Sequence, residues 1–433
     1  MISIPFIYFT CILLYQLKRK KWSIDIASFI LIIFATSAFF SILIDVFGQR
    51  SMDTHNYVIS PIACFAYCSL ITLCVWPFMR YSNLQIKKIS PIRNASVLKY
   101  LAIFFFLFTL LNMFMSYESI LKILSSDDFG QIRKAHHDGL QEMSWLATLP
   151  FSIRFPFTIV NLLLGCSWIL VFLAFFIIIV QKCKFRYGFY YMFASISGIL
   201  DNILIAGRSA MIFWMIGFVG CYIFFRPYTN LMIKKKINFL FIIIGVLFFL
   251  YLSAITISRF GERDAGEITG TQGGLISYMG QSYINFCYFF DTYDCPMPTL
   301  QTLFPLTYKL QGSIDGAGQL QQVLTFMSKK EVGVFYTFIG HIIITTFNAF
   351  GIAFCFFYSF ISSLSVRKVK KKVISVSNAY IYLLLSSVMF LGLFSYYYSY
   401  ASKTVPAIFY AIILYQLQIK EKKNFNNIYN HKR

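Results

Sequence analysis

Long apolar runs separated by short polar connections make up most of this sequence. A helix needs about 20 mostly apolar residues to cross a bilayer, and runs near this length recur along the whole chain. They predict eleven spans, at residues 2–17, 23–47, 57–79, 97–117, 157–180, 188–206, 209–225, 237–257, 346–364, 376–394 and 404–417. We therefore expect an all-α polytopic membrane protein, with residues 1–433 forming a single integral membrane domain.

Basic residues follow an alternating pattern between the predicted spans. Every second connection and the C-terminal tail together hold 26 of the 38 Lys and Arg residues, at 18–21, 80–99, 182–186, 226–236, 367–372 and 420–433. Because basic loops stay on the cytoplasmic side, the pattern predicts a periplasmic N-terminus and a cytoplasmic C-terminus. The net charge of +21 is thus divided among short clusters, which argues against a nucleic-acid partner.

Two of the predicted outer segments are large, residues 118–156 and residues 258–345. Within the second, residues 274–293 alternate polar and apolar positions with helical spacing, which predicts an amphipathic helix at the outer membrane interface. Its polar side includes Gln281 and Asn285, and its apolar side includes Tyr283 and Phe286. The alternative interpretation of this stretch is a twelfth span.

The composition and the absence of certain motifs exclude several classes of function. Only 13% of the residues are charged, against about 25% in soluble domains. The chain has no glycine-rich nucleotide loop and no HExxH or DxD motif, so we expect neither a nucleotide-driven pump nor a bound metal or cofactor. His136 and His137 are adjacent, and adjacent side chains on a helix diverge too far to share one ion. Cys287 and Cys295 would pair only in an oxidising compartment.

An arginine stands between two spans at the predicted outer face. Residues 207–210 read Gly-Arg-Ser-Ala, and Asp201 lies two helical turns before Arg208. An arginine near the membrane interior is costly unless it is paired or reaches water, so Arg208 is a functional candidate. The alternatives are a structural Asp201–Arg208 pair or an arginine that reaches the lipid headgroups.

More charged residues emerge just after the span at 237–257. Arg259 and Arg263 could join Arg208 in binding a diphosphate, because the guanidinium group binds phosphate in a bidentate manner and stays charged. Candidates for a general base are Glu262, Asp264 and, where the chain re-enters the membrane, His341. The alternative interpretations are a solvated loop of mixed charge and a histidine that only packs.

These segments resemble the signatures of one family. Residues 207–210 are similar to the Gly-Ser/Arg-Arg-Ser signature of the Wzy-type polymerases of O-antigen and capsule repeat units. Residues 278–286 resemble a Tyr/Gly/Phe-rich stretch in their large periplasmic loop. Residues 334–337 and 348–351 resemble the segment at which their chain re-enters the membrane, although Asn348 stands where the family has an acid.

The resemblance implies a metal-independent glycosyltransferase of the bacterial inner membrane. Its donor would be a glycan on undecaprenyl diphosphate, and its acceptor the terminal sugar of a new lipid-linked repeat unit. Tyr278, Gln281, Tyr283 and Asn285 would bind the glycan, although aromatic belts explain interfacial Tyr equally well. A chain-length regulator protein would be a further partner besides the bilayer. The alternative functions are a flippase for lipid-linked oligosaccharides and an O-antigen ligase.

Overall fold

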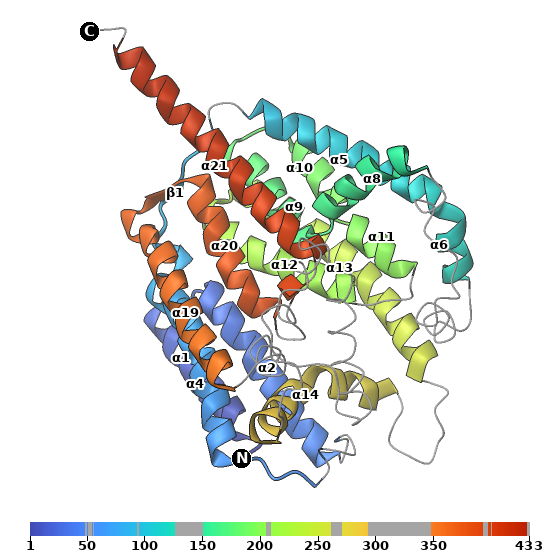
Figure 1. Ribbon diagram of the computed structural model, residues 1–433, viewed down its shortest axis with the longest axis vertical. Coiled ribbons are helices and arrows are strands. Elements are labelled where there is room, and N and C mark those ends of the chain that lie inside the picture. The colour runs from blue at the N-terminus through green and yellow to red at the C-terminus, as the bar shows by residue number, and fades with distance from the viewer. Residues whose placement is uncertain are drawn as a thin grey trace. The chain divides into compact units, whose positions relative to one another are not determined.

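The computed structural model describes residues 1–47, 50, 54, 56–92, 95–125, 150–204, 209–260, 271–292, 348–392, 397–399 and 401–430. These residues are mostly helical (Figure 1). Their packing divides into two compact units, and the single integral membrane domain predicted from the sequence stays a prediction. Unit 1 comprises Met1–Gln85, Arg263–Lys370 and Leu384–Ala401, and unit 2 comprises Ile86–Glu262, Lys371–Leu383 and Ser402–Arg433.

Unit 1 is a helical bundle. In it, α14 packs against α2 and α4, α1 packs against α2, and α19 packs against α4 (Figure 1). Its elements are α1 (Ile4–Arg19), α2 (Ile26–Val46), α4 (Pro61–Arg80), η1 (Asn83–Gln85), α14 (Thr271–Thr292), α19 (Asn348–Val366) and η6 (Tyr397–Ser399). The short helix η5 (Arg367–Lys371) follows α19.

Unit 2 contains the shorter and more interrupted helices. They are α5 (Ser96–Met115), α6 (Tyr117–Leu124), α8 (Phe151–Leu164), α9 (Ser167–Phe175), the π-helical turn η3 (Phe176–Val180), α10 (Phe185–Ala194), α11 (Ser197–Ile203), α12 (Ser209–Phe225), η4 (Arg226–Tyr228), α13 (Leu231–Phe260) and α21 (Ala401–Asn430). Strands β1 (Lys88–Ile89) and β2 (Val373–Ile374) pair in parallel, and α20 (Val376–Phe390) follows β2.

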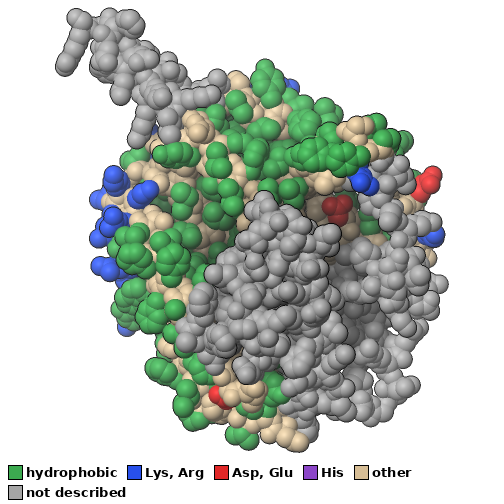
Figure 2. Space-filling view, viewed as in Figure 1, with side chains coloured by type: hydrophobic (Ala, Val, Ile, Leu, Met, Phe, Trp, Pro, Cys, Tyr) green, Lys and Arg blue, Asp and Glu red, His purple; other side chains and the backbone are tan. Residues whose placement is uncertain are grey.

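The described helices confirm an all-α membrane protein. Each of the eleven predicted segments contains helix, and five helical stretches in the described part are long and apolar enough to cross a bilayer. Exposed apolar residues on α5, such as Leu107 and Phe114, fit a surface that faces lipid. Figure 2 shows apolar side chains over α5 and basic side chains gathered over η5. The count of eleven crossings and the periplasmic position of residues 258–345 stay predictions.

Two segments predicted as continuous spans are interrupted. Residues 157–180 form α8 and α9, which meet at a bend of 66°. Residues 188–206 form α10 and α11, with Ser195 and Ile196 between them. Hydropathy averages over a window, so it cannot detect a break made of small or apolar residues. If the bent pair counts as one span, the candidate crossings in the described residues number six.

A buried carboxylate begins α2. Asp25 caps the helix by accepting hydrogen bonds from the Ser28 backbone N–H at 2.9 Å and from the Ser28 hydroxyl at 2.8 Å. The Ser82 hydroxyl and the Gln16 amide donate to its other oxygen at 2.6 and 3.2 Å. Because several donors compensate this charge, Asp25 is stable in the interior and has a structural role.

The predicted helix at residues 274–293 exists as α14, and it packs inside unit 1. The Ser37 hydroxyl donates to the Met279 carbonyl at 2.9 Å, and the Ser41 hydroxyl donates to the Gly280 carbonyl. A Cβ atom on Gly280 would lie 2.4 Å from the Phe40 backbone, so the contact between the helices requires glycine. Small residues allow membrane helices to approach this closely.

Candidate functional site

The site begins at the break between α8 and α9. Helix α8 ends at Leu164 with Gly165 as its C-cap, the backbone leaves the helical region at Cys166, and α9 starts at Ser167. The last four carbonyl groups of any helix lack partners within it. In an apolar environment these carbonyls need donors from elsewhere, so this break is a polar position inside a segment that hydropathy marks as a span.

Lys403, in the first turn of α21, supplies such a donor. Its ammonium group donates a hydrogen bond to the Gly165 carbonyl. The start of α21 lies so close that a Cβ atom on Gly165 would approach the Ser402 carbonyl oxygen to 2.7 Å. Glycine is therefore required at position 165 for α21 to reach the break.

The core of unit 2 fixes the positions of α9 and α21. Trp168, in the first turn of α9, is fully buried and stacks on Tyr380 of α20, with ring centroids 5.7 Å apart. The Tyr380 hydroxyl donates to the carbonyl of Ala407, one turn beyond Lys403, at 2.8 Å. This chain of buried contacts holds the Lys403 ammonium at the break.

An acidic residue lies within electrostatic range of this lysine. The charges of Asp201 and Lys403 interact, and Gly198, one turn before Asp201 on α11, faces the Gly165 carbonyl. Asp201 is exposed and Lys403 is half-buried. A solvent-exposed carboxylate within electrostatic range of an ammonium group can accept a proton or orient a hydroxyl group.

The neighbouring residue connects this position to the predicted motif at 207–210. The Asn202 side-chain oxygen accepts a hydrogen bond from the Ala210 backbone N–H at 3.4 Å, near the start of α12. The last residue of the motif therefore lies beside α11, at Asn202. We name Gly165, Asp201, Asn202 and Lys403 the Asp201 cluster.

The Asp201 cluster also contains two helix N-termini. Helices α9 and α21 both begin beside Gly165, and the N-terminal end of a helix carries a partial positive charge. The Lys403 ammonium adds positive charge here, while the C-terminal end of α8 and the Asp201 carboxylate add negative charge, so the cluster combines both signs. In membrane proteins such half-helix ends commonly face anionic groups of a substrate.

Five of the six residues predicted for catalysis and diphosphate binding lie outside the described part of the chain. These are Arg208, Glu262, Arg263, Asp264 and His341. Arg259 lies in the last turn of α13, in unit 2. The predicted convergence of Arg208, Arg259 and Arg263 therefore stays a prediction.

The predicted glycan-binding residues all lie on α14. Tyr283 is fully buried, packs on Tyr67 with ring centroids 4.9 Å apart, and donates its hydroxyl to the Met1 carbonyl at 3.3 Å. Asn285 is 2% exposed, Gln281 is half-buried, and Tyr278 belongs to the same helix. In this structure, Tyr283 and Asn285 are thus part of the packing of unit 1, and their glycan-binding role stays a prediction.

Sequence reasoning missed Lys403. It considered Asp201 only as the partner of Arg208, whereas Lys403 contributes to the surroundings of Asp201 in the structure. A signal was present, because Lys403 falls in a connection that the charge pattern assigns to the outer side. Most basic residues lie in connections assigned to the cytoplasmic side, so a lysine on the outer side is an exception that marks a position worth testing.

Comparisons with protein-family models, with curated proteins and with solved structures give no match. Function must therefore be argued from the residues and their geometry.

Proposed function

We propose that the chain is a glycosyltransferase that polymerises lipid-linked oligosaccharide repeat units at the outer face of the bacterial inner membrane. The observation that carries the proposal is the Asp201 cluster: an accessible carboxylate, a lysine and two helix N-termini at a break in a predicted span. Ionisable groups within membrane segments usually serve function, because they are costly to keep there. The resemblance of residues 207–210 to the polymerase signature adds independent support.

The reaction needs one base and fixed positive charge. An acceptor hydroxyl attacks the anomeric carbon of the donor glycan, the bond from that carbon to the diphosphate oxygen breaks, and the hydroxyl proton passes to the base. Asp201 joins Glu262, Asp264 and His341 as a candidate for this base. The departing diphosphate gains negative charge, which Lys403 and the predicted arginines would stabilise.

The direction of the chain agrees with an outer-face site. Under the predicted topology, Gly165 lies in the outer half of the span at 157–180, and Asp201 lies near the outer end of the span at 188–206. Lys403 precedes the span at 404–417 on the same side. A substrate anchored in the outer leaflet by its lipid would then carry its diphosphate near the level of these groups.

The test is the length of the surface glycan in a strain that lacks the protein. We expect the wild-type protein and the control Glu118→Gln to restore long chains, since Glu118 is exposed on α6 and outside the cluster. Asp201→Asn should lower polymerisation by about 10²- to 10⁴-fold, the usual contribution of a general base. Normal chain length in the Asp201→Asn strain, at equal protein level, would refute a catalytic role for Asp201.

A second candidate is a flippase for the same lipid-linked units. The broken segment with charged groups beside it favours this class, since transporters use interrupted helices to bind anionic substrates. The two functions predict different accumulation in the strain without the protein. Single lipid-linked repeats on the outer leaflet support the polymerase, and repeats retained on the inner leaflet support the flippase. A ligase would instead leave lipid A core wholly uncapped.

A further inference from the structure

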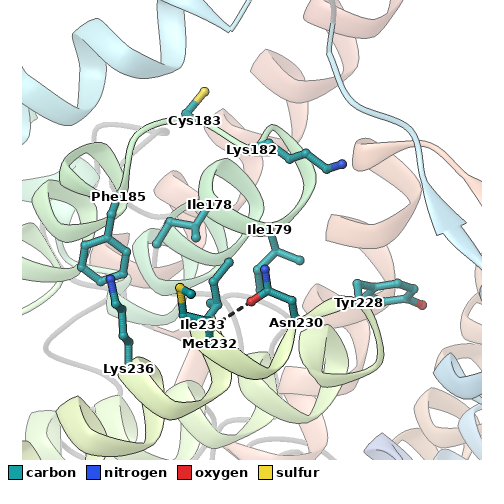
Figure 3. Close-up of a pocket in the computed structure, with 10 residues that line it drawn as sticks. All are labelled: Ile178, Ile179, Lys182, Cys183, Phe185, Tyr228, Asn230, Met232, Ile233 and Lys236. Atoms are coloured by element: carbon teal, nitrogen blue, oxygen red, sulfur yellow. Dashed lines mark hydrogen bonds between the residues drawn. The ribbon is translucent and has the colours of Figure 1, made fainter.

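A pocket of unit 2 lies between the end of the α9–η3 segment and the first turns of α13, and none of its lining residues belongs to the Asp201 cluster (Figure 3). Its volume is about 560 Å³, within the range of roughly 300–1,000 Å³ typical of small-molecule sites. Figure 3 shows Lys182 on one side of the pocket and Lys236 on the other. Under the predicted topology, the connections that form it lie on the cytoplasmic side.

One wall of the pocket has an irregular backbone. Helix α9 continues into the π-helical turn η3, and such turns occur frequently at functional sites. After this turn Lys182 has a φ of 52°, in the left-handed region that favours glycine or asparagine. The Cys183 backbone N–H donates to the Ile177 carbonyl at 3.1 Å and closes the turn. A lysine at this position keeps a positive charge at the edge of the pocket.

The opposite wall is the start of α13. The Asn230 side chain caps the helix by accepting the Ile233 N–H at 2.8 Å, and its first turn contains no acidic residue (Figure 3). The Lys236 ammonium lies 5.6 Å from the centroid of the Phe185 ring. This contact fixes the lysine at the pocket. Two lysines and a helix N-terminus thus give the pocket a positive character.

The rest of the lining is apolar. Ile178 and Ile179 come from η3, and Met232 and Ile233 come from α13. A free inorganic anion gains no binding energy from an apolar surface. A lipid can use both parts of the pocket, because it has a charged headgroup and apolar chains. Anionic lipids are known to occupy basic pockets between membrane helices on the cytoplasmic side. The lining therefore matches an amphiphile with a negative head.

We propose that this pocket binds an anionic phospholipid of the inner leaflet. The headgroup phosphate lies at Lys236 and the start of α13, Lys182 adds positive charge at the opposite edge, and the start of an acyl chain lies along Ile178, Met232 and Ile233. The site does not depend on the glycosyltransferase reaction, so it can be tested on purified protein without a glycan substrate.

The experiment measures the affinity of the purified full-length protein for short-chain lipids by calorimetry. The probes are dihexanoyl phosphatidylglycerol, dihexanoyl phosphatidylcholine and inorganic phosphate. We expect phosphatidylglycerol to bind, and the other two to bind at least about tenfold more weakly, because each lacks either the net charge or the apolar part. Equal affinity for phosphatidylcholine, or for phosphate alone, would overturn the proposal.

Variants locate the site. At about 1 kcal/mol for a lysine near an anionic headgroup, Lys236→Gln should weaken phosphatidylglycerol binding about fivefold, and Lys182→Gln, at the opposite edge of the pocket, should weaken it less. The control is Lys235→Gln, which removes the same charge one residue from Lys236 but outside the pocket. An equal loss in the control would show that only overall charge matters and would refute the site. The thermal midpoint without lipid checks that each variant is folded.

Discussion

Two glycine contacts, one in each unit, have similar geometry but different chemistry around them. A Cβ atom on Gly280 would meet the Phe40 backbone at 2.4 Å, and a Cβ atom on Gly165 would meet the Ser402 carbonyl at 2.7 Å. Beside Gly280, the neutral hydroxyl of Ser41 donates to its carbonyl. Beside Gly165, the donor is the charged Lys403.

Under the proposed function, the difference separates a contact that serves packing from one that serves function. A serine hydroxyl satisfies a carbonyl between membrane helices at little cost, so nothing beyond packing is needed to explain Ser41. A lysine that donates to a carbonyl in the same way also carries a charge, and removing that charge from water costs free energy. Under the proposed function, this charge would serve a substrate with negative charge.

The largest expected effect comes from removing that charge. Lys403→Met should lower glycan polymerisation at least about 100-fold, because one fixed donor to a developing negative charge typically contributes this much. Gel analysis of surface glycan length checks the result. The control Lys122→Met removes an exposed lysine of α6 and should leave chain length unchanged. Comparable losses in both variants would show that the effect is not specific to the cluster.

The next effect distinguishes the two glycine contacts. Gly165→Ala and Gly280→Ala should each destabilise the protein by about 1–3 kcal/mol through overpacking. Gly245→Ala is the matched control, because nothing lies within 4 Å of its added Cβ atom. A thermal midpoint in detergent measures this destabilisation for all three proteins.

Only Gly165→Ala should also reduce polymerisation per folded molecule, since it moves Lys403 away from the break. Gly280→Ala should retain its specific activity. If both variants lose specific activity to the same extent, the distinction between a packing contact and a functional contact fails.

A smaller effect is expected at the cap of α2. Asp25→Ala removes an acceptor from Ser28 and Ser82 and should cost about 1–3 kcal/mol. Specific activity should stay unchanged, because Asp25 belongs to unit 1 and is buried. The thermal midpoint and glycan length, measured on the same preparations, test both parts. Loss of activity without loss of stability would contradict the structural role.

The smallest effect is expected at the exposed end of α14. The Asp291 carboxylate accepts hydrogen bonds from the Tyr57 hydroxyl at 2.5 Å and from the Ser60 hydroxyl at 3.0 Å. Asp291→Asn keeps the shape of the side chain, so we expect a loss of stability below about 1.5 kcal/mol. Chemical unfolding of the purified protein would detect it, and a loss above about 3 kcal/mol would show that this contact is buried in solution.

The hydropathy pattern predicted where helices occur, because a bilayer requires each crossing segment to be apolar and helical. The same pattern predicted that α14 is a helix, but it did not predict which helices pack against α14. Helical spacing put Asn285 on a polar side, whereas α14 packs against both α2 and α4 and buries this residue. The spacing of polar and apolar residues separates a helix into one polar and one apolar face. It therefore cannot predict burial where two neighbouring helices cover different faces.

The candidate site was only partly predictable. Asp201 stood out as an acid within an apolar run, but its proximity to Lys403 depends on the break at Gly165 and on the docking of α21. Both features result from contacts between segments more than 200 residues apart in the sequence. No local pattern encodes them, and a glycine beside a cysteine in an apolar segment gives no strong signal of its own.

The central claim is that Asp201 is reached from the outer side of the membrane. The direct test is a cysteine at this position, Asp201→Cys, labelled in spheroplasts with a membrane-impermeant maleimide against the unmodified protein as background. Lys182→Cys serves as the cytoplasmic reference. We predict labelling at position 201 in intact spheroplasts and labelling at position 182 only after permeabilisation. Labelling at position 201 that also requires permeabilisation would contradict the account.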